Sequence, residues 1–536
     1  MTNTLYYGDN LEILREHVPD ESVDLVYLDP PFNSNASYNV LFREQTGEES
    51  PAQIKAFTDT WEWTQESQRT FEQEIMLNPA APANVREMVN AFRQFIGSNA
   101  MMAYLVMMTP RLVELRRVLK PTGSIYLHCD PTASHYLKLL MDAVFGGENF
   151  RNELIWKRQS AHSDARGYGS VHDTVLFYAK SDSYRWNSTF QPYDPKYVEQ
   201  YYRYTDSDGR RFMSGDVSAA GLQGGGYEYE WKGVVRVWRV PIETMQRLDE
   251  ENRIFYTRNG IPRIKRYLDE SSGMPVQDVW TDIESLRSWH KERLGYPTQK
   301  PEGMLERIIA ASSNEGDVVM DPFCGCGTAI AAAHKLNRNW IGIDITHLAV
   351  ALMKNRLKTA FNILPGQDYR VVGEPVDAGS ARALAELDRF QFQFWAMSLL
   401  EAFPREQDKR GADRGIDGVV YFIDGPRRAV NKAIVQVKSG RVSSPLIRDL
   451  VGTVEREKAA MGLFITLEEP TRDMRTEAIS AGFYHSDLWQ TDYPRIQIRT
   501  VGELLEGRAF EIPRHPQTYQ PAQRITRPAG EQGRLE

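Results

Sequence analysis

The feature that most constrains the fold is a strand–turn–helix unit in the second half of the chain. An apolar run over 316–321 predicts a buried strand, the segment DPFCGCGTA (321–329) predicts a tight turn, and a helix follows before another apolar strand over 339–344. Gly325 and Gly327 let the backbone turn sharply and approach a ligand closely, which larger side chains would prevent. Strands that alternate with helices in this way indicate an α/β sheet with crossover connections.

The same alternation appears near the start of the chain, where apolar runs over 22–29 and 124–130 predict further strands. Between the two regions the composition changes: Tyr, Trp, Arg and Gly become abundant and short strands outnumber helices, which is typical of an inserted domain. We therefore expect five parts, namely a first α/β part (1–150), an insertion (151–284), a second α/β part (285–375), a separate small α/β unit (376–510) and a Pro- and Arg-rich tail that is predicted to be disordered (511–536).

Length and composition set broad limits on the class of protein. A chain of 536 residues is too long for one compact domain, and 41% hydrophobic residues are ordinary for a globular protein. The apolar stretch MMAYLVMM (101–108) is too short to cross a membrane, and the first residues lack the pattern of a signal peptide. Three cysteines cannot build a disulfide framework, so we expect a reducing cytoplasm. The net charge of −8 argues against a general polyanion binder, but local basic clusters still allow site-specific binding.

The turn segment also predicts the kind of cofactor. Asp344 ends the next strand 23 positions after Asp321, which is the spacing at which a carboxylate meets ribose hydroxyls in dinucleotide-binding folds. A dehydrogenase fingerprint would need a third glycine where this chain has Ile330, and the helix start lacks an open phosphate cradle. A cofactor without phosphates therefore fits better, and glycines that serve packing alone are the alternative. Cys324 and Cys326 do not indicate zinc, because the chain has one other cysteine and no histidine pair lies nearby.

A second chemical signal is the tetrapeptide DPPF, which follows the predicted strand over 22–29. Open α/β sheets place ligands at the carboxyl ends of their strands, and the two prolines hold the backbone rigid there. The exocyclic amine of a base is a poor nucleophile, because its lone pair is delocalised into the ring. Asp29 and the carbonyl of Pro30 could accept both amine hydrogens, with Pro31 stiffening the turn and Phe32 stacking on a base swung out of the helix. Methyl transfer from a sulfonium needs positioning and local electrostatics but no metal. The alternative is a simple turn after a strand.

Taken together, five segments resemble the motifs of the DNA amino-methyltransferases. Their order, with the DPPF segment before the glycine-rich one, is similar to the permuted β class, and DPP-aromatic resembles adenine methylases more than the SPP-aromatic of cytosine amino-methylases. The resemblance covers roughly 1–45, 110–180 and 290–355. The five segments are GDNLEIL (8–14), SVDLVYLDPPF (22–32), SIYLHCDPTASHYLKLLMDAVFG (124–146), YPTQKPEGMLERII (296–309) and DPFCGCGTAIAAAHKLNRNWIGID (321–344).

The resemblance implies a Rossmann-like α/β fold, S-adenosylmethionine as the cofactor and double-stranded DNA as the substrate. Asp344 would bind the ribose hydroxyls, where this family often has Glu, while Asp9 would lie near the adenine of the cofactor and Lys300 would close over its methionine end. The segment over 151–284 would carry target recognition, and dimers are common among such enzymes. The residues expected around the cofactor are Asp321, Pro322, Phe323, Gly325, Gly327 and Thr328. Candidates for contacts to phosphates or guanine are Arg236, Arg239, Arg263, Lys265 and Arg266, with a solvated charged surface as the alternative.

The small C-terminal unit contains a hairpin-like pair of strands over 411–440. Asp417 opens the first strand, and Gln436 and Lys438 alternate on one face of the second. A carboxylate, a polar group and a lysine that converge in this way suit a Mg²⁺ site with an activated water. Residues 390–485 resemble the restriction-endonuclease fold in its Mrr-type variant, with Asp…Gln-x-Lys in place of Asp…Glu-x-Lys, and this resemblance implies Glu401 as a further metal ligand. The alternative is a degenerate nuclease fold that only binds DNA or a partner.

The sequence therefore predicts a site-specific DNA adenine-N6 methyltransferase fused to a Mg²⁺-dependent nuclease domain, acting in restriction–modification or defence. A nucleic-acid-binding or regulatory protein with vestigial sites is the alternative from a different class. Methylation of cytosine N4 or of RNA is a third interpretation.

Overall fold

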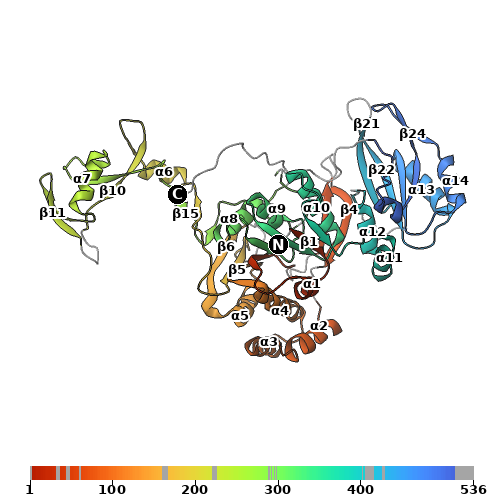
Figure 1. The fold of residues 1–536 in the computed structure, drawn as a ribbon, viewed down its shortest axis with the longest axis horizontal. Helices are drawn as coiled ribbons and strands as arrows, with labels where there is room; N and C mark the ends of the chain where they lie inside the picture. Colours follow the sequence, from red (N-terminus) through yellow and green to blue (C-terminus); the bar gives the residue numbers. More distant parts are fainter. Residues whose placement is uncertain are drawn as a thin grey trace. The chain divides into compact units, whose positions relative to one another are not determined.

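The computed structural model describes most of the chain (Figure 1). It separates into two compact units, one made of Met1–Asn187 together with Asp278–Glu536 and the other of Ser188–Gln277. The described residues are 3–31, 37–43, 49–58, 62–159, 167–219, 226–287, 290, 292–294, 296, 298–400, 403–404, 416–424 and 429–513.

In the described part of the first unit, nine strands form one sheet in the order β16-β6-β7-β5-β2-β17-β18-β1-β19. β7 pairs antiparallel with both of its neighbours, whereas the other neighbouring pairs are parallel. The carboxyl ends of β1, β18, β17 and β2 therefore meet at one edge of the sheet. The bounds are β1 Thr4–Tyr7, β2 Val23–Leu28, β5 Leu119–Cys129, β6 Phe150–Lys157, β7 His172–Ala179, β16 Val279–Trp280, β17 Val318–Asp321, β18 Asn339–Asp344 and β19 Arg370–Val372.

Helices cover both faces of this sheet. In the middle of Figure 1, α8, α9 and α10 are labelled above β1 and β5, and α3, α4 and α5 below them. α4 is buried along most of its length, and its Leu105 and Leu112 belong to the same apolar core as Val26 of β2 and Leu127 of β5. The bounds are α1 Asn10–His17, α2 Gln65–Arg69, α3 Ala83–Ile96, α4 Ala100–Val118, α5 Ser134–Phe145, α8 Glu302–Ser312, α9 Thr328–Lys335 and α10 His347–Phe361, with a π-helix at Thr70–Met76 and a hairpin of β3 (Ser37–Arg43) and β4 (Glu49–Thr58).

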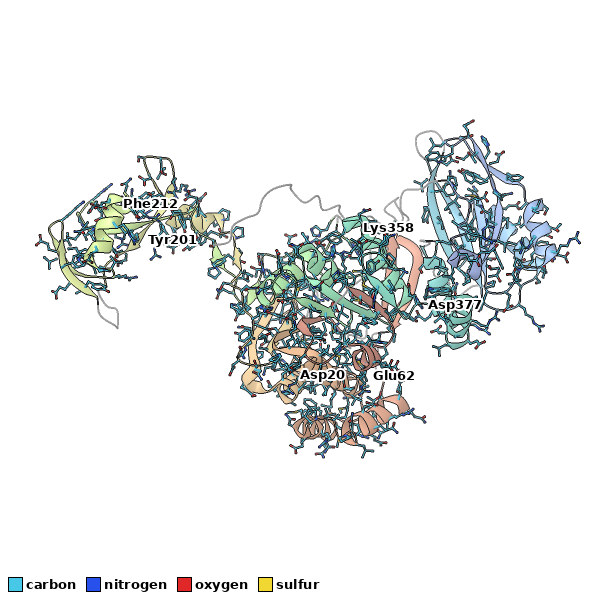
Figure 2. All side chains as sticks on the ribbon, viewed as in Figure 1. Asp20, Glu62, Tyr201, Phe212, Lys358 and Asp377 are labelled. Carbon is cyan, nitrogen blue, oxygen red and sulfur yellow. The ribbon has the colours of Figure 1, made fainter. Side chains whose placement is uncertain are left out.

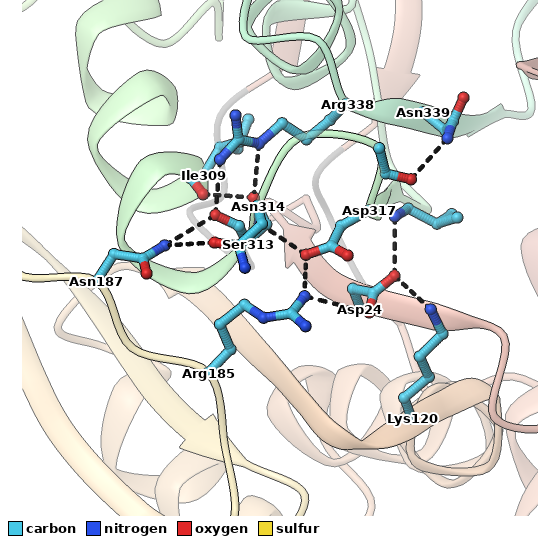
Figure 3. A network of polar contacts seen from close by, with 12 residues as sticks. Asp24, Lys120, Arg185, Asn187, Ile309, Ser313, Asn314, Asp317, Arg338 and Asn339 are labelled. Carbon is cyan, nitrogen blue, oxygen red and sulfur yellow. Dashed lines mark hydrogen bonds and ion pairs between the residues drawn. The ribbon is translucent and has the colours of Figure 1, made fainter. Parts of the chain in front are cut away.

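The amino ends of the central strands are tied together by a buried carboxylate (Figure 3). Asp24 of β2 is 4% exposed and accepts hydrogen bonds from Lys120 Nζ at 2.7 Å and from the backbone N–H of Val318 at 2.9 Å. Arg185 lies between Asp24, at 3.7 Å, and Asp317, with which it forms an ion pair. The network therefore joins β2, β5 and β17 to the segment after β7, close to the point where the chain leaves for the second unit.

The second compact unit is narrower than the insertion predicted over 151–284. β6 and β7 lie inside that interval, yet they belong to the nine-stranded sheet, and Val175 and Tyr178 of β7 are fully buried. The composition changes near 151, but the pairing of β5 with β7 keeps the chain in the nine-stranded sheet, and the first compact unit extends to Asn187. The change in composition therefore precedes the start of the second unit, at Ser188, by almost forty residues.

The unit Ser188–Gln277 contains a four-stranded sheet in the order β13-β14-β10-β9, the hairpin β11–β12 and the antiparallel pair of β8 with β15. Its core is formed by Trp231, Trp238, Met245 and their neighbours, and Tyr201 and Phe212 of this unit are labelled in Figure 2. The bounds are β8 Phe190–Gln191, α6 Pro195–Tyr201, β9 Tyr204–Thr205, β10 Arg211–Asp216, β11 Tyr227–Trp231, β12 Val234–Trp238, α7 Ile242–Glu250, β13 Ile254–Tyr256, β14 Pro262–Tyr267 and β15 Met274–Pro275.

The C-terminal part has its own five-stranded sheet in the order β20-β21-β22-β23-β26, with a core on each face. The predicted α/β fold class is confirmed for both sheets. Of the predicted tail, 511–513 are described and the rest lies outside the described residues. The bounds are α11 Ala378–Leu387, α12 Arg389–Ser398, β20 Phe403–Pro404, β21 Gly418–Asp424, β22 Ala429–Lys438, α13 Ser444–Arg456, β23 Met461–Thr466, α14 Arg472–Ser480, β24 Phe483–Ser486, β25 Thr491–Pro494, β26 Ile496–Thr500 and α15 Val501–Leu505.

Among the described residues, no helix combines the length and the apolar character that crossing a membrane requires. All three cysteines are buried free thiols.

Candidate active site

A cavity of about 350 Å³ opens at the edge of the sheet where the parallel strands end. Segments that are far apart in the sequence meet there, because each follows the carboxyl end of a central strand or packs beside one. Gly327 does not line the cavity, and Phe32 lies outside the described residues. The predicted site residues that line it are Asp9, Asp29, Pro30, Pro31, Lys300, Asp321, Pro322, Phe323, Gly325, Thr328 and Asp344.

The glycine-rich turn after β17 is shaped by its backbone. Gly327 has a left-handed conformation with φ of 75° at the start of α9, and a Cβ atom there would lie 2.5 Å from Cγ of Met353. Gly325 also has a positive φ, and its N–H donates a hydrogen bond of 2.8 Å to Oδ2 of Asp344. The N–H of Phe323 donates to Oδ1 of Asp321 at 3.0 Å. Glycine is therefore required at 327 both by its backbone angle and by close packing, while two carboxylates hold the turn.

Two of the carboxylates at the cavity, Asp321 and Asp344, are largely shielded from solvent. Burial raises the pKa of Asp321 well above its usual range, and the neighbouring charges of Asp29 and Asp344 raise it further. Burial also raises the pKa of Asp344, against hydrogen bonds from Thr346 and Gly325 that lower it. A cationic or hydrogen-bond-donating ligand would stabilise the charged forms of both groups. The predicted contact of Asp344 with ribose stays a prediction.

Two further residues at the cavity, Asn10 of α1 and Arg111 of α4, were not predicted from the sequence. Oδ1 of Asp9 caps the helix by accepting from the N–H of Leu11 at 2.7 Å, and its Oδ2 pairs with Arg111 at 2.7 Å. Arg111 also donates to Oδ1 of Asn10 at 2.5 Å, and Asn10 donates to the carbonyl of Pro322 at 2.8 Å. Arg111 lies in α4 among the basic residues of an amphipathic pattern, so the sequence carried no signal that its side chain is only 12% exposed and faces the cavity.

Asp29 and Lys300 form an ion pair in the cavity wall, although 271 positions separate them in the sequence. Their side chains are only 15% and 12% exposed. The pair occupies Oδ2 of Asp29. Oδ1 of Asp29 is buried, and no hydrogen-bond partner for it is present among the residues that the structure describes. Asp29 therefore presents one oxygen atom that is engaged and one that can accept a hydrogen bond.

A buried polar chain lies beside this pair. The hydroxyl of Tyr27 lies 3.1 Å from Nδ1 of His128, and Nε2 of His128 lies 3.2 Å from Oδ2 of Asp173. Tyr27 lines the cavity two positions before Asp29. Burial raises its pKa well above the usual range, and the charges of Asp29, Asp321 and Asp173 act in the same direction, so Tyr27 is a neutral hydroxyl at physiological pH. The sequence could not show this chain, because its members come from three strands.

The basic residues proposed for DNA contact in the second unit divide into two groups. Lys265 is 6% exposed and its ammonium is held by Asp206 at 2.7 Å, so its charge already has a partner within this unit. Arg263 donates to Oγ of Ser214 at 3.1 Å and is half-buried. The exposed members of the set are Arg236, Arg239 and Arg266.

The predicted nuclease centre has Asp417 and Gln436 buried at 7% and 3% exposure. The pairing of Gly418 with Val435 places Asp417 and Gln436 at neighbouring positions of the two strands. Oδ2 of Asp417, however, accepts a hydrogen bond of 2.6 Å from the backbone N–H of Val437, so this oxygen holds the hairpin together. Glu401 lies outside the described residues, and within the described ranges no three His, Cys, Asp or Glu side chains are grouped so that they could hold a metal.

Comparison with known proteins gives two family matches. A family model described as DNA methylase, of the N6 and N4 type, matches residues 23–355, and one described as NACHT-associated inactive Restriction Endonuclease 1 matches residues 391–506. The second match supports a restriction-endonuclease-like domain at the C-terminus but not the Mg²⁺-dependent activity expected from Asp417 and Lys438.

Individual relatives are modification enzymes. The chain is 36% identical over 276 residues to the Type II methyltransferase M.EcaI of Enterobacter cloacae, which covers 50% of this chain and 60% of the relative. It is 28% identical over 358 residues to the Mod subunit of the Type III restriction-modification enzyme StyLTI of Salmonella typhimurium, covering 62% of this chain and 50% of the relative. The chain thus spans half to three fifths of the length of these relatives.

Among solved structures, a DNA modification methylase from Thermus thermophilus in complex with S-adenosyl-L-methionine is similar at 16% identity and a TM-score of 0.33, covering 70% of this chain and 99% of that one. The DNA methylase match spans more than half of the chain and contains both Asp29 and the turn after β17. The chain belongs to the N6/N4 DNA methylase family.

Proposed function

We propose that the protein transfers a methyl group from S-adenosylmethionine to the N6 amine of adenine at a specific sequence in double-stranded DNA, as a β-class enzyme. The observation that carries this proposal is the convergence of Asp29, with its buried acceptor oxygen, and the glycine-rich turn after β17 on one cavity. The DPP sequence supports adenine over cytosine, and cytosine N4 is the alternative within the same family.

The residues of the cavity fit this cofactor. Asp9, Asp29, Asp321 and Asp344 give it an acidic wall, which suits a ligand that carries a sulfonium and hydroxyl groups but no phosphates. The turn over 321–327, with Asp344, would surround the nucleoside, Asp9 would lie at the adenine, and Lys300 at the methionine end. When bound, the cofactor supplies a methyl group attached to a positively charged sulfur.

The chain's own groups would prepare the amine. Asp29 and the carbonyl of Pro30 would each accept one of its hydrogens, so that the nitrogen lone pair points away from the ring towards the methyl carbon. As the new C–N bond forms and the C–S bond breaks, positive charge develops on the amine, and the Asp29 carboxylate would stabilise it and accept the departing proton. Phe32 would stack on the extruded base.

Single-molecule sequencing of methylation-free DNA after incubation with the protein and S-adenosylmethionine, without Mg²⁺, tests this function. We expect N6-methyladenine at one recurring short sequence. N4-methylcytosine would move the assignment to the alternative amine. Unmodified DNA, combined with no heat on titrating folded protein with S-adenosylmethionine, would support a DNA-binding or regulatory protein with vestigial sites.

For the C-terminal domain we propose a nuclease-like fold that binds DNA or a partner without cutting. The bond from Val437 to Asp417 and the match to an inactive nuclease family support this. We expect that adding Mg²⁺ leaves unmethylated and methylated plasmid intact, and that Lys438→Ala changes nothing on an agarose gel. Cleavage that needs Mg²⁺ and disappears in Lys438→Ala would restore the nuclease centre of Asp417, Gln436 and Lys438.

The wider setting also follows from the resemblance. We propose a role in restriction–modification or defence in the cytoplasm, with a homodimer as the arrangement common among such enzymes.

A further inference from the structure

Among the described residues, two cations line the cavity, Arg111 and Lys300, and they are held in different ways. The guanidinium of Arg111 donates to Asp9 at 2.7 Å, to Asn10 at 2.5 Å and to the carbonyl of Met107 at 2.9 Å, so all three of its nitrogens are fixed by the protein. Lys300 is a compact charge on a flexible four-carbon stem, and it pairs with Asp29. Of the two cations, Lys300 is the one that can change partner without dismantling a helix cap.

The pairing with Lys300 works against the use of Asp29 as an acceptor. One of its two oxygens is occupied, and the ammonium offsets the negative charge that would stabilise a positively charged amine. The pair is mostly buried, at 15% and 12% exposure, so water screens it poorly. A competing carboxylate that enters the cavity could take the ammonium and leave both oxygens of Asp29 available. S-Adenosylmethionine carries such a carboxylate on its amino-acid end.

We propose that Lys300 is shared between Asp29 and the amino-acid carboxylate of the cofactor, so that cofactor binding releases the catalytic carboxylate for the target amine. This inference rests on the proposed function and adds an order to it, in which the cofactor is bound before Asp29 is free. Lys300 is thus a positioning residue that acts through Asp29. We call the ion pair between Asp29 and Lys300 the lock. It joins the end of β2 to the segment before α8.

The lock predicts that removing the charge of Asp29 strengthens the binding of a cofactor analogue. In Asp29→Asn, the ion pair that holds Lys300 in the cofactor-free protein is lost, so S-adenosylhomocysteine should bind about 5- to 150-fold more tightly, the usual range of coupling between two linked equilibria. This thioether is chosen because it keeps the amino-acid carboxylate but lacks the sulfonium, which Asp29 itself would attract. Lys300→Met should weaken its binding. 5′-Methylthioadenosine, which lacks the amino-acid end, should change by no more than about twofold in either variant. Isothermal calorimetry measures the affinities of both ligands for the wild type and for the two variants.

The double variant Asp29→Asn/Lys300→Met tests whether Asp29 acts on the ligand through Lys300 or through its own charge. If Asp29 acts by holding Lys300, Asp29→Asn should have no further effect on S-adenosylhomocysteine in the Lys300→Met background. An equal gain in that background, or no gain in the single variant, would overturn the lock and leave the proposed function standing. Wild-type protein that binds neither S-adenosylhomocysteine nor S-adenosylmethionine would overturn both. Lys138→Met is the matched control, because Lys138 pairs with Asp142 at 2.7 Å outside the cavity and should leave every affinity unchanged.

Discussion

Replacing Asp29 with alanine should lower the single-turnover rate of methyl transfer by about 10²- to 10⁴-fold, the range typical of a group that handles a proton in the transition state. The variant loses both the engaged oxygen Oδ2 and the buried acceptor Oδ1. Without them the amine keeps its lone pair in the ring, and no carboxylate stabilises the charge that develops on the nitrogen. Transfer of a labelled methyl group to a short duplex that contains the modified sequence measures the rate.

Cofactor binding should survive this change. Loss of Asp29 removes an attraction for the sulfonium but also releases Lys300 from the ion pair towards the amino-acid carboxylate, and the two effects oppose each other. We therefore expect similar affinity for S-adenosylmethionine by calorimetry. Asp20→Ala is a suitable control: Asp20, labelled in Figure 2, is 73% exposed and pairs with Arg117 away from the cavity. Loss of transfer and of binding together would show that Asp29 holds the structure rather than the amine.

The convergence on this cavity could be predicted because it depends on strand ends. Asp29 follows β2, Asp321 ends β17 and Asp344 ends β18, and the apolar runs before them mark each strand in the sequence. In a parallel sheet such ends share one edge, so three residues that are far apart in the chain can meet there. The α/β fold confirms the strands of this prediction, whereas the roles of the three carboxylates stay predictions.

The side chains that contact these residues could not be predicted from the sequence, because those contacts depend on how separate elements pack together. Arg111 looks like a solvent-facing residue of an amphipathic helix, and only the packing of α4 against α1 turns it towards Asp9. The contacts between Tyr27, His128 and Asp173 likewise depend on the lateral order of β2, β5 and β7. Periodicity reports which face of an element is buried but not which element covers that face.

Two charged residues have partners within the folded chain that the sequence did not indicate. Lys265 in β14 was a candidate for a DNA contact, but it is 6% exposed and is paired with Asp206. Asp417 was expected to bind a metal, but one of its oxygens accepts a hydrogen bond from the next strand. In both cases the residue type suggested a ligand, whereas the folded chain supplied an internal partner.

We expect a second large effect, on stability, from a substitution at the amino ends of the central strands. Asp24→Ala should destabilise the methylase sheet by about 1–3 kcal/mol, because it leaves the buried N–H of Val318 without an acceptor and Lys120 without its ion-pair partner. Asp24 is 4% exposed, and its loss would leave Lys120, Arg185 and the N–H of Val318 without their shared acceptor (Figure 3). The free energy of opening is best measured by hydrogen exchange of the amides in β2 and β17 under increasing urea, because a chain of several domains has no single unfolding transition.

Asp24→Asn makes this test specific. Asparagine keeps an oxygen that can accept from Val318 but removes the charge, so its cost should lie between those of wild type and Asp24→Ala. Since Arg185 also pairs with Asp317, part of the network should persist in both variants, and the amides of β5 should lose less protection than those of β17. Asp20→Ala should change little, because its partner Arg117 is also bonded to Glu114 and to the carbonyl of Leu14. A cost for Asp24→Ala no larger than that of Asp20→Ala would show that the strands hold together without the buried carboxylate.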